Sequence, residues 1–419
     1  MQEYNNIRKN VCTAVGVMSG TSLDGLDMVL CRFERACGKN GNSGSHQSVQ
    51  DNAPQSQSLT GTSQDAGKLH SGGNASWKFN VLKAGTLSYS GTEWPQKLLD
   101  AETAGGFKLM ELHRDFGRFT GESVNDFLKD PGMPPASRVN LIASHGHTVF
   151  HRPEKNITLQ IGDGAEIAAK TGITTVSDFR GLDVALGGQG APLVPAGDEL
   201  LFGHYTFCLN LGGFANISFR ESGKRLAFDI CPVNIVMNRL AREKGVEFDR
   251  GGQMAAGGSV DTDLLNKLES LRFYTLGGPR SLGKEWVDEV FMPVLECSRA
   301  GVADKLRTVC EHIALRIAAV TNDYRKEQKT SGSSNRTDPA AAGSLLITGG
   351  GARNDFLTGL IAEKVSPVSM VIPEEELVDY KEAIIFAFLG ILRLRNEINC
   401  LASVTGASRD NCGGIIHLA

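Results

Sequence analysis

The sequence predicts an α/β protein of two related domains, each with a mixed β-sheet flanked by helices. Three observations support this prediction. Short apolar strands alternate with segments of helical periodicity, which is the pattern of layered α/β architectures. The order strand, glycine turn, strand, strand and helix occurs near residue 11 and again from Tyr205, without a literal repeat of the sequence. The length of 419 residues allows two or three domains.

The first domain is predicted to open with a β-hairpin followed by a third strand. Apolar strands at 11–18 and 26–33 flank a turn rich in Gly, Ser and Asp, and the third strand follows at 77–90. Residues 36–76 are too polar to offset the entropy of ordering them. We therefore expect a disordered insertion at 36–76, in a loop between strands where added length costs little.

The rest of the first domain alternates between helices and short strands. A helix is predicted at 109–128, and a strand at 139–143 runs into the sequence SHGHT (144–148), which we expect to form a loop. The remaining predicted elements are short strands at 159–161 and 174–176, with a helical turn at 164–170 between them.

The second domain is predicted to repeat the order of the first. Its elements are strands at 207–211, 215–219 and 225–228, helices at 234–244 and 310–325, a polar insertion at 326–344, a strand at 345–348 and a helix from about 354. A last amphipathic helix is predicted at 380–395. We therefore divide the chain into a first domain (1–204), a second domain (205–379) and a C-terminal segment (380–419) that returns to the first.

Composition and charge exclude several classes of function. The chain has 43 Lys and Arg against 47 Asp and Glu, and this balance argues against a partner such as nucleic acid or an anionic membrane surface. We expect neither a signal peptide nor a membrane span. The 9 cysteines form no CxxC motif, which is typical of reduced thiols, so we expect a cytoplasmic protein without a disulfide framework or a zinc site.

Three glycine-rich turns are candidate phosphate-binding loops. They lie at 20–25, at 211–216, and at 348–354 between a strand and a helix, where the helix dipole and free N–H groups favour an anion. One such turn alone is more often only a turn or a helix cap. Three of them at corresponding places in two halves favour a nucleotide site, although the chain has neither a Walker motif nor a dinucleotide fingerprint.

Two long sequence blocks allow a resemblance to be stated. MSGTSLDGLD (18–27) and DFRGLDVALGGQGAPLVP (178–195) resemble the signatures of the anhydro-N-acetylmuramic acid kinases, members of the sugar kinase, heat-shock protein and actin superfamily. Shorter matches occur at 144–148, 159–163, 210–217, 348–354 and 404–407. Together they cover nearly the whole chain except the two polar insertions. The resemblance implies two actin-like (ribonuclease H-like) domains with an ATP cleft between them.

The resemblance also implies which residues bind ATP and its Mg²⁺. No protein group is expected to ligate the metal directly; Asp24 is expected to hold it through water. The residues implied for the nucleotide are Gly20, Thr21, Ser22, Leu23, Asp24, Gly25, Leu26, Asp27, Gly212, Gly213, Asp229, Asn234, Gly349, Gly350, Gly351 and Asn354.

One segment departs from the family pattern. Where the family commonly has Asp-x-Gly-Pro-Gly-Asn, this chain reads DICPVN (229–234), so Cys231 and Val233 replace two glycines. A Cβ atom disfavours positive φ and fills space, so these residues are expected to hinder the approach of the backbone to a phosphate. We expect a variant kinase rather than an inactive one.

Breaking a glycosidic bond with water requires a base that activates the water. Asp183 is the candidate base that the resemblance implies. Asp183 precedes a glycine-rich loop whose Gly188, Gln189 and Gly190 are expected to contact the substrate, together with His145. Spacing alone leaves a second interpretation open, in which Asp183 caps the loop or pairs with Arg180. The carboxyl group of Asp178 is the competing candidate, although its position at a strand end beside Arg180 favours an ion pair.

Two further patterns in the sequence were weighed. His145, His147 and His151 have a spacing that can bind one metal ion, but no nearby Cys or paired carboxylate completes such a site. The RSLGKEW block (280–286) also resembles a family block, and Lys284 and Glu285 are either ligand contacts or a solvated helix start.

The predicted function is an ATP-dependent phosphotransferase. The resemblance implies that the protein opens 1,6-anhydro-N-acetylmuramic acid hydrolytically and phosphorylates O6 to give N-acetylmuramic acid 6-phosphate, in peptidoglycan recycling. The alternatives are a kinase for another anhydrosugar such as levoglucosan, or a non-catalytic ATP-gated binding module of the same superfamily. The expected partner is the small anhydrosugar alone, and the resemblance hints at a homodimer.

Overall fold

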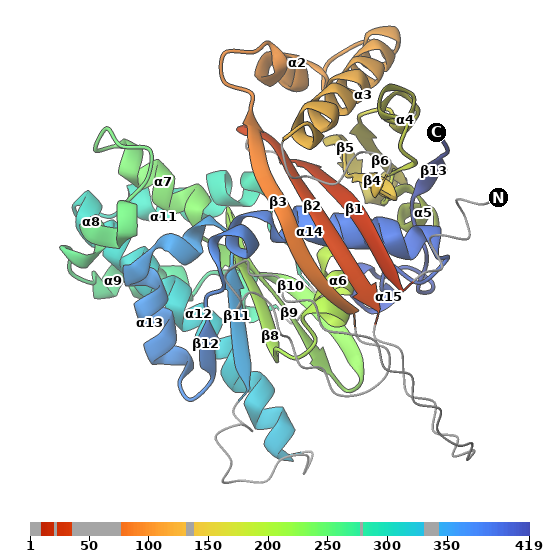
Figure 1. Ribbon diagram of the computed structural model, residues 1–419. Coiled ribbons are helices and arrows are strands. Elements are labelled where there is room, and N and C mark those ends of the chain that lie inside the picture. The colour runs from red at the N-terminus through yellow and green to blue at the C-terminus, as the bar shows by residue number, and fades with distance from the viewer. Residues whose placement is uncertain (1–9, 21–22, 36–76, 131–137, 277–279, 331–342) are drawn as a thin grey trace, which may run out of the picture.

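The computed structural model describes residues 10–20, 23–35, 77–130, 138–276, 280–330 and 343–419. Their first sheet is mixed and contains six strands in the order β13-β7-β4-β1-β2-β3 (Figure 1). Antiparallel β2 pairs with β1 and β3, whereas β4 and β7 run parallel to β1. These strands are β1 (Val11–Ser19), β2 (Gly25–Arg35), β3 (Trp77–Ser88), β4 (Leu141–Ser144), β7 (Thr175–Ser177) and β13 (Ile415–His417).

The second sheet has five strands in the order β10-β9-β8-β11-β12. Its strands are β8 (Phe207–Leu211), β9 (Phe214–Glu221), β10 (Lys224–Pro232), β11 (Ser344–Thr348) and β12 (Ser369–Val371). Leaving β13 aside, both sheets place their strands in the spatial order third, second, first, fourth and fifth, with only the second strand antiparallel to the first. This shared topology confirms the predicted fold class of two related actin-like units.

A third, two-stranded sheet corrects the sequence prediction. The segment with His147 and His151 was predicted to be a loop, but it forms β5 (His147–Arg152), which pairs antiparallel with β6 (Ile157–Ile161). His147 stands opposite Ile161 in this pairing. β5 forms because its backbone groups pair with those of β6. The polar residues of this segment do not indicate that pairing in the sequence.

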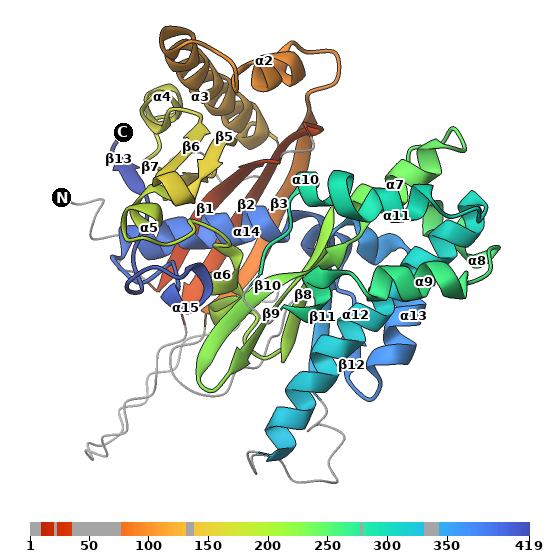
Figure 2. The ribbon, with the colours of Figure 1, turned by 180° about the vertical axis from the view of Figure 1, so that it is seen from behind.

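The helices of the first half lie on both faces of the first sheet (Figures 1 and 2). One side of the sheet contributes alternate residues such as Val15 and Ile142 to a core with Phe116 of α3, and the other side contributes Ala14 to a core with Phe388 of α14. This alternation follows from the period of two along a strand. The helices are α2 (Trp94–Asp100), α3 (Gly106–Leu128), α4 (Gly164–Thr171), α5 (Gly181–Ala185) and α6 (Val194–Leu201).

The second half is richer in helices. Its sheet packs into one core with residues of α7, α12 and α13. Its α-helices are α7 (Asn234–Arg242), α8 (Gln253–Ala256), α9 (Thr262–Glu269), α10 (Lys284–Trp286), α11 (Met292–Glu296), α12 (Val302–Thr330) and α13 (Asp355–Val365), and α14 (Glu375–Leu394) and α15 (Ala402–Thr405) follow them in the C-terminal segment. Short 3-10 or π turns lie at η2 (Pro153–Lys155), η3 (Arg250–Gly252), η4 (Arg272–Thr275), η5 (Val287–Phe291) and η7 (Gly350–Arg353).

Two predicted boundaries differ from the structure. Helix α12 extends to Thr330, so the first residues of the predicted polar insertion at 326–344 are helical, and residues 331–342 lie outside the described residues, as does the predicted insertion at 36–76. Helix α14 begins at Glu375, before the predicted division at residue 380. Low apolar content at 326–330 does not end the helix, because Lys, Glu and Gln all have good helix propensity.

Helix α14 lies between the two sheets and packs against β1, β2 and β4 as well as β11 (Figure 1). Gly16 permits the close approach to β1, because a Cβ atom there would lie 1.9 Å from the carbonyl oxygen of Ala383.

No helix in the described part of the chain has both the length and the apolar character that a membrane crossing needs.

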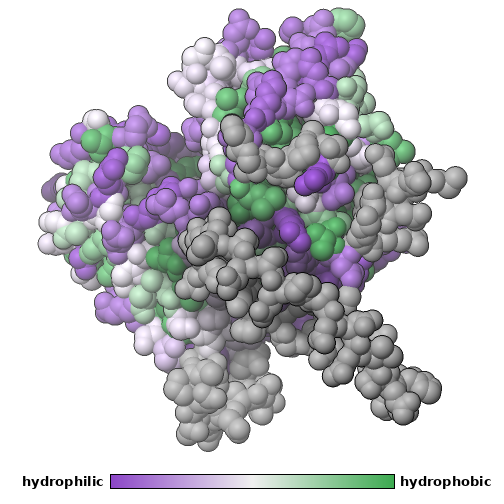
Figure 3. Space-filling view, in the orientation of Figure 1, coloured by the Kyte–Doolittle hydropathy of each residue, from purple (hydrophilic) through white to green (hydrophobic). Residues whose placement is uncertain are grey.

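Hydrophilic side chains cover much of the α2–α3 region on the face seen in Figure 3. Three large apolar side chains of these helices are nevertheless exposed: Leu99, Phe107 and Met110.

Candidate active site

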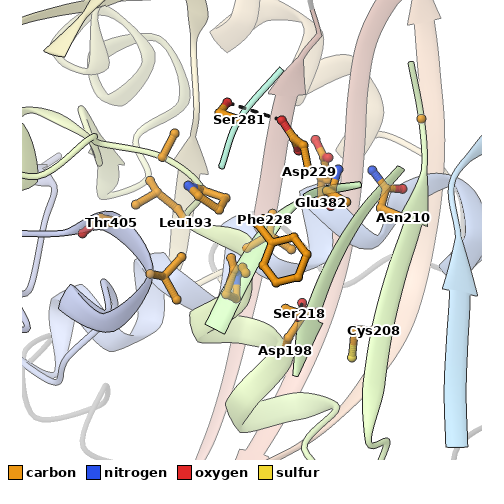
Figure 4. A pocket seen from close by; sticks show the side chains of 18 of the residues that line it. Leu193, Asp198, Cys208, Asn210, Ser218, Phe228, Asp229, Ser281, Glu382 and Thr405 are labelled. Carbon is orange, nitrogen blue, oxygen red and sulfur yellow. Dashed lines mark hydrogen bonds between the residues drawn. The ribbon is translucent and has the colours of Figure 1, made fainter. Parts of the chain in front are cut away.

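A cavity of about 1000 Å³ lies between the two sheets and is lined by both halves of the chain. In Figure 4, Asp229, Asn210 and Glu382 lie toward one end, and Leu193 and Thr405 lie toward the other. Residues from the first and third glycine turns therefore face one cavity, as the sequence predicts. The residues that line it include Gly20, Asp27, Arg180, Gln189, Asn210, Gly212, Asp229, Arg280, Gly349, Lys381, Glu382 and Thr405.

The first glycine turn joins β1 to β2. Its Thr21 and Ser22 lie outside the described residues. Gly20 and Asp27 line the cavity, while Gly25 and Leu26 are buried in the start of β2, and Leu23 has a positive φ of 58°. The turn therefore lies between β1 and β2 as the sequence predicts, and among its described residues Gly20 and Asp27 face the cavity.

Two carboxylates of this first turn differ in position. Asp24 is exposed and does not line the cavity, whereas Asp27 does. Thr86 donates a hydrogen bond of 2.5 Å to Oδ1 of Asp27. Burial raises the pKa of Asp27, and the nearby charges of Asp379 and Asp24 act in the same direction. Of these two carboxylates, Asp27 therefore faces the cavity, and the predicted role of Asp24 in holding the metal through water stays a prediction.

The second glycine turn is supported by the start of α7. The backbone N–H of Val233 donates to the carbonyl of Gly213 at 2.8 Å, and Nδ2 of Asn234 donates to the carbonyl of Leu211 at 3.1 Å. Gly212 lines the cavity, but Asn234 does not. The side chain of Asn234 therefore holds the second glycine turn in place by binding the backbone carbonyl of Leu211.

The replaced glycines do not obstruct the cavity. Cys231 and Val233 are fully buried in the core of the second half, and Val233 has a φ of −129°. Neither residue has a positive φ and neither lines the cavity, and the expected hindrance to the approach of the backbone to a phosphate stays a prediction. Their side chains point into the core instead.

Asp229, at the end of β10, does line the cavity. Its Oδ2 accepts hydrogen bonds from the backbone N–H of Leu282 at 2.8 Å and from the hydroxyl of Ser281 at 3.3 Å, as Figure 4 shows for the second bond. Burial raises the pKa of Asp229, and these two hydrogen bonds act against the rise.

The third glycine turn lies beside the second. Gly349 has a φ of 84°, and a Cβ atom there would lie 2.4 Å from Oδ1 of Asn210, so glycine is required both by conformation and by space. Gly350 and Gly351 form a 3-10 turn with Gly351 buried. Asn354 caps α13, its Oδ1 accepting from the N–H of Leu357 at 3.0 Å. Among the predicted residues of this turn, only Gly349 lines the cavity.

Asp183 is completely buried beneath the glycine-rich loop. Its Oδ1 accepts hydrogen bonds from Asn411 at 2.8 Å, from Thr405 at 2.9 Å and from the thiol of Cys400 at 3.0 Å. Its Oδ2 accepts one bond, from the N–H of Gly190 at 2.8 Å. The carboxylate therefore binds the loop to the C-terminal segment, as the loop-capping interpretation expects.

The loop that covers Asp183 depends on its glycines. A Cβ atom on Gly188 would lie 2.2 Å from Oδ2 of Asp183, so only glycine fits over the carboxylate. Gln189 lines the cavity, and its N–H donates to the carbonyl of Thr405 at 2.8 Å. Gly188 and Gly190 do not line it. The predicted loop thus presents Gly187 and Gln189 to the cavity, while Gly188 and the N–H of Gly190 meet the buried carboxylate.

His145 supports Arg180 and does not line the cavity. Its Nδ1 donates to the carbonyl of Gly146 at 2.9 Å, so Nε2 is the acceptor for Nε and Nη2 of Arg180, at 3.0 and 2.8 Å. Burial, followed by the charge of Arg180, lowers the pKa of His145 well below its usual value. Both ring nitrogens are occupied, so the predicted direct contact of His145 with a sugar is not available in this arrangement.

Arg180 is the residue of this cluster that reaches the cavity, and the sequence did not assign it a contact with ligand. Its Nη1 donates to the carbonyl of Gly190 at 2.8 Å, and burial lowers its pKa to about 10, against the opposing charge of Glu382. The predicted ion pair with Asp178 is replaced by a local turn, in which Oδ1 of Asp178 accepts from the N–H of Gly181 at 3.0 Å.

Glu382 and Lys381, in the second turn of α14 and beyond, were also missed. Both line the cavity, and burial raises the pKa of Glu382. Nζ of Lys381 lies 2.7 Å from Oδ1 of Asp198 on α6. A Lys-Glu pair directly before a long apolar helical run was the signal that could have revealed them, because charges at the buried end of such a helix need partners.

Two sheets of the same topology, with a cavity between them that glycine turns of both halves line, define an actin-like phosphotransferase. A family model described as anhydro-N-acetylmuramic acid kinase matches residues 95–419. The chain therefore belongs to the anhydro-N-acetylmuramic acid kinase family, and it is a kinase.

Curated relatives agree with this family. The anhydro-N-acetylmuramic acid kinase of Mannheimia succiniciproducens is 34% identical over 428 residues, which cover 96% of this chain and 98% of that protein. The protein of the same name from Gloeobacter violaceus is 34% identical, over 74% of this chain and 82% of its own length. Among solved structures, the activator of the 2-hydroxyisocaproyl-CoA dehydratase from Clostridium difficile with bound ADPNP aligns with 91% of this chain and 96% of its own, at 11% identity and a TM-score of 0.38.

Proposed function

We propose that the protein transfers the γ-phosphoryl group of ATP to O6 of 1,6-anhydro-N-acetylmuramic acid while water opens the anhydro bond, giving N-acetylmuramic acid 6-phosphate for peptidoglycan recycling. The observation that carries the proposal is a single cavity that joins the glycine turns of both halves to the loop above Asp183. Family membership supports the same substrate.

We place the phosphates of ATP at the end of the cavity with Gly20, Gly212 and Gly349, where backbone groups can come close to an anion. Asp27 has a carboxylate at this end, and carboxylate oxygens suit Mg²⁺ that keeps most of its water. The metal would neutralise charge on the phosphates. The sugar is then left with the other end, beside Arg180, Gln189 and Thr405.

We propose Asp183 as the base that takes a proton from the attacking water. Its Oδ2 accepts only one hydrogen bond among the described residues, so this oxygen has the free acceptor capacity that a base needs. The carboxylate is fully buried, and therefore the loop at 187–190 or the segment at 405–407 has to move before water reaches it. Such rearrangement on substrate binding is common in enzymes that close around their ligands.

Steady-state ADP release from MgATP tests the proposal. The assay compares 1,6-anhydro-N-acetylmuramic acid, levoglucosan and no sugar at equal concentrations, with mass spectrometry of the product. Phosphorylated product from the first sugar, with little ADP release without sugar, is the expected result. Preference for levoglucosan would assign the other anhydrosugar, and nucleotide binding without turnover on either sugar would favour the binding module.

Three further proposals accompany this function. The protein acts in the cytoplasm, binds its small substrate without nucleic acid or membrane partners, and forms a homodimer. Sedimentation at several concentrations tests the last of these.

A further inference from the structure

Three cationic side chains of the described residues line the cavity: Arg180, Arg280 and Lys381. Lys381 is paired with Asp198 at 2.7 Å. Arg180 is held by His145 and has Glu382 as a nearby opposing charge. Within the described residues, Arg280 alone of the three has neither an ion pair with a carboxylate nor a named acidic neighbour that balances it.

The guanidinium group of Arg280 is fixed by groups that carry no charge. Its Nη1 donates to the carbonyl of Leu276 at 2.6 Å, and its Nε donates to the carbonyl of Asp229 at 3.3 Å. The guanidinium carbon lies 4.7 Å from the ring centre of Phe273 and 5.6 Å from that of Phe228. These contacts orient the cation while leaving its charge uncompensated.

Asp229 is close in space but does not neutralise Arg280. Its carboxylate is turned toward the N–H of Leu282 and the hydroxyl of Ser281, and only its backbone carbonyl meets Arg280. In the described part of the chain, Nη2 of Arg280 makes no hydrogen bond to protein. The free nitrogen of a held guanidinium suits a phosphate oxygen, because Arg binds phosphate through parallel N–H groups.

Burial lowers the pKa of Arg280, because it disfavours the charged form of the guanidinium group. An anion in the cavity would favour it. Arg280 shares its wall with Asp229, and the turns of Gly212 and Gly349 line the same cavity. The anion that this end of the cavity receives is the triphosphate of the nucleotide, under the function proposed above.

We propose that Arg280 binds the γ-phosphate of ATP and stabilises the charge on the phosphoryl group during its transfer. The bond between O6 and phosphorus forms while the bond from phosphorus to the β-phosphate oxygen breaks, and the electron pair leaves with ADP. Arg280 stays protonated throughout, so it acts through charge and hydrogen bonding only. This proposal rests on the proposed function for its phosphoryl acceptor but not for its nucleotide.

The decisive test compares two nucleotides on the Arg280→Gln variant. Calorimetry should show affinity for AMPPNP, which keeps the γ-phosphate, reduced roughly 10- to 100-fold. Affinity for ADP should stay within about twofold. Arg280→Lys should recover part of the AMPPNP affinity, because it restores the charge without the fork. The matched control is Arg239→Gln, which removes an arginine of the same half that is paired with Asp288 outside the cavity.

Several outcomes separate this proposal from its alternatives. Equal loss of affinity for both nucleotides would mean that Arg280 only supports the loop, and unchanged affinity for both would mean that it binds no phosphate; either result overturns the proposal. A raised KM for the acidic sugar with an unchanged affinity for AMPPNP would assign Arg280 to the sugar carboxylate, which also overturns it. Absence of turnover in the wild type would remove the proposed function, while the comparison of nucleotides would still decide the role of Arg280.

Discussion

The two walls of the cavity are built in different ways. The first-half wall is held by hydrogen bonds of buried side chains. Asp183 accepts a hydrogen bond from Gly190 in the loop at 187–190, and His145 accepts one from Arg180. The second-half wall consists of turns whose neighbouring side chains point into the core, as Cys231 and Val233 do. We therefore expect substitutions in the first-half wall to change activity and stability together, and substitutions in the second-half wall to change one without the other.

The largest expected effect is that of Asp183→Asn in the first wall. An amide in place of the carboxylate has to turn N–H groups toward the present donors, and it cannot take a proton from water. We expect the free energy of unfolding to fall by about 2–4 kcal/mol. Turnover per folded molecule should fall by roughly two to four powers of ten. Urea unfolding and ADP release, measured on the same sample, give both quantities.

Asp178→Asn provides the control for this variant. Asp178 has a φ of 49° and accepts one hydrogen bond from the N–H of Gly181, and Asn tolerates this conformation and offers the same acceptor. We expect near-normal stability and turnover. If Asp183→Asn kept its turnover and lost only stability, Asp183 would be a structural residue, and the first wall would carry no base.

The next effect concerns the buried ion pair between Lys381 of α14 and Asp198 of α6. Lys381→Met leaves Asp198 without its nearest cation, with only Nη2 of Arg225 at 3.8 Å, and should lower the free energy of unfolding by about 3 kcal/mol. Asp198→Asn in the same chain should restore part of the loss, because no unpaired charge then remains. Thermal unfolding of the two variants and the double variant measures the coupling; purely additive losses would show that the pair contributes nothing as a pair.

A smaller effect tests the second wall. Val233→Gly restores a glycine of the family pattern but removes a fully buried side chain, so it should lower the free energy of unfolding by about 2–3 kcal/mol. The KM for ATP should change less than about twofold, because the Val233 side chain lies outside the cavity. A clear fall in KM would mean that this side chain does obstruct the phosphate, against the arrangement described.

The smallest effect is expected from Asp27→Asn. The pKa of Asp27 is raised in the folded protein above its ordinary value of 3.8, so its ionisation destabilises the fold at neutral pH and has no effect below 3.8. The variant should gain roughly 0.5 kcal/mol at neutral pH after solvent screening, and the gain should vanish as the pH falls toward 3.8. It should also lose activity with MgATP. Unfolding at several pH values checks the sign, since a loss of stability at neutral pH would contradict it.

The sequence predicted the sheets and turns well because their signals are local. Nearly continuous apolar runs mark β1 and β2, and glycine-rich segments mark the three turns. Asn354 shows the limit of such signals, because the same residue type serves as a phosphate neighbour and as the cap that it forms on α13.

The side chains of the first wall could not be assigned from the sequence for a different reason. Arg180 is 35 residues from its partner His145, and Asp183 meets Thr405 across 222 residues. Spacing along the chain carries no information on such contacts. The sequence did not single out Arg280 either, because its proposed role depends on which carboxylates lie near it in space.

Strand β13 gives the molecule an order of assembly. Residues 415–417 complete the edge of a sheet whose first strand lies about 400 positions earlier, by pairing with β7. The strands β8 to β12 of the second sheet, by contrast, all lie between residues 207 and 371, with no described strand of the first sheet among them. All strands of the second sheet therefore precede α14 and β13 in the chain, and the first sheet completes its packing and its edge only with these later elements.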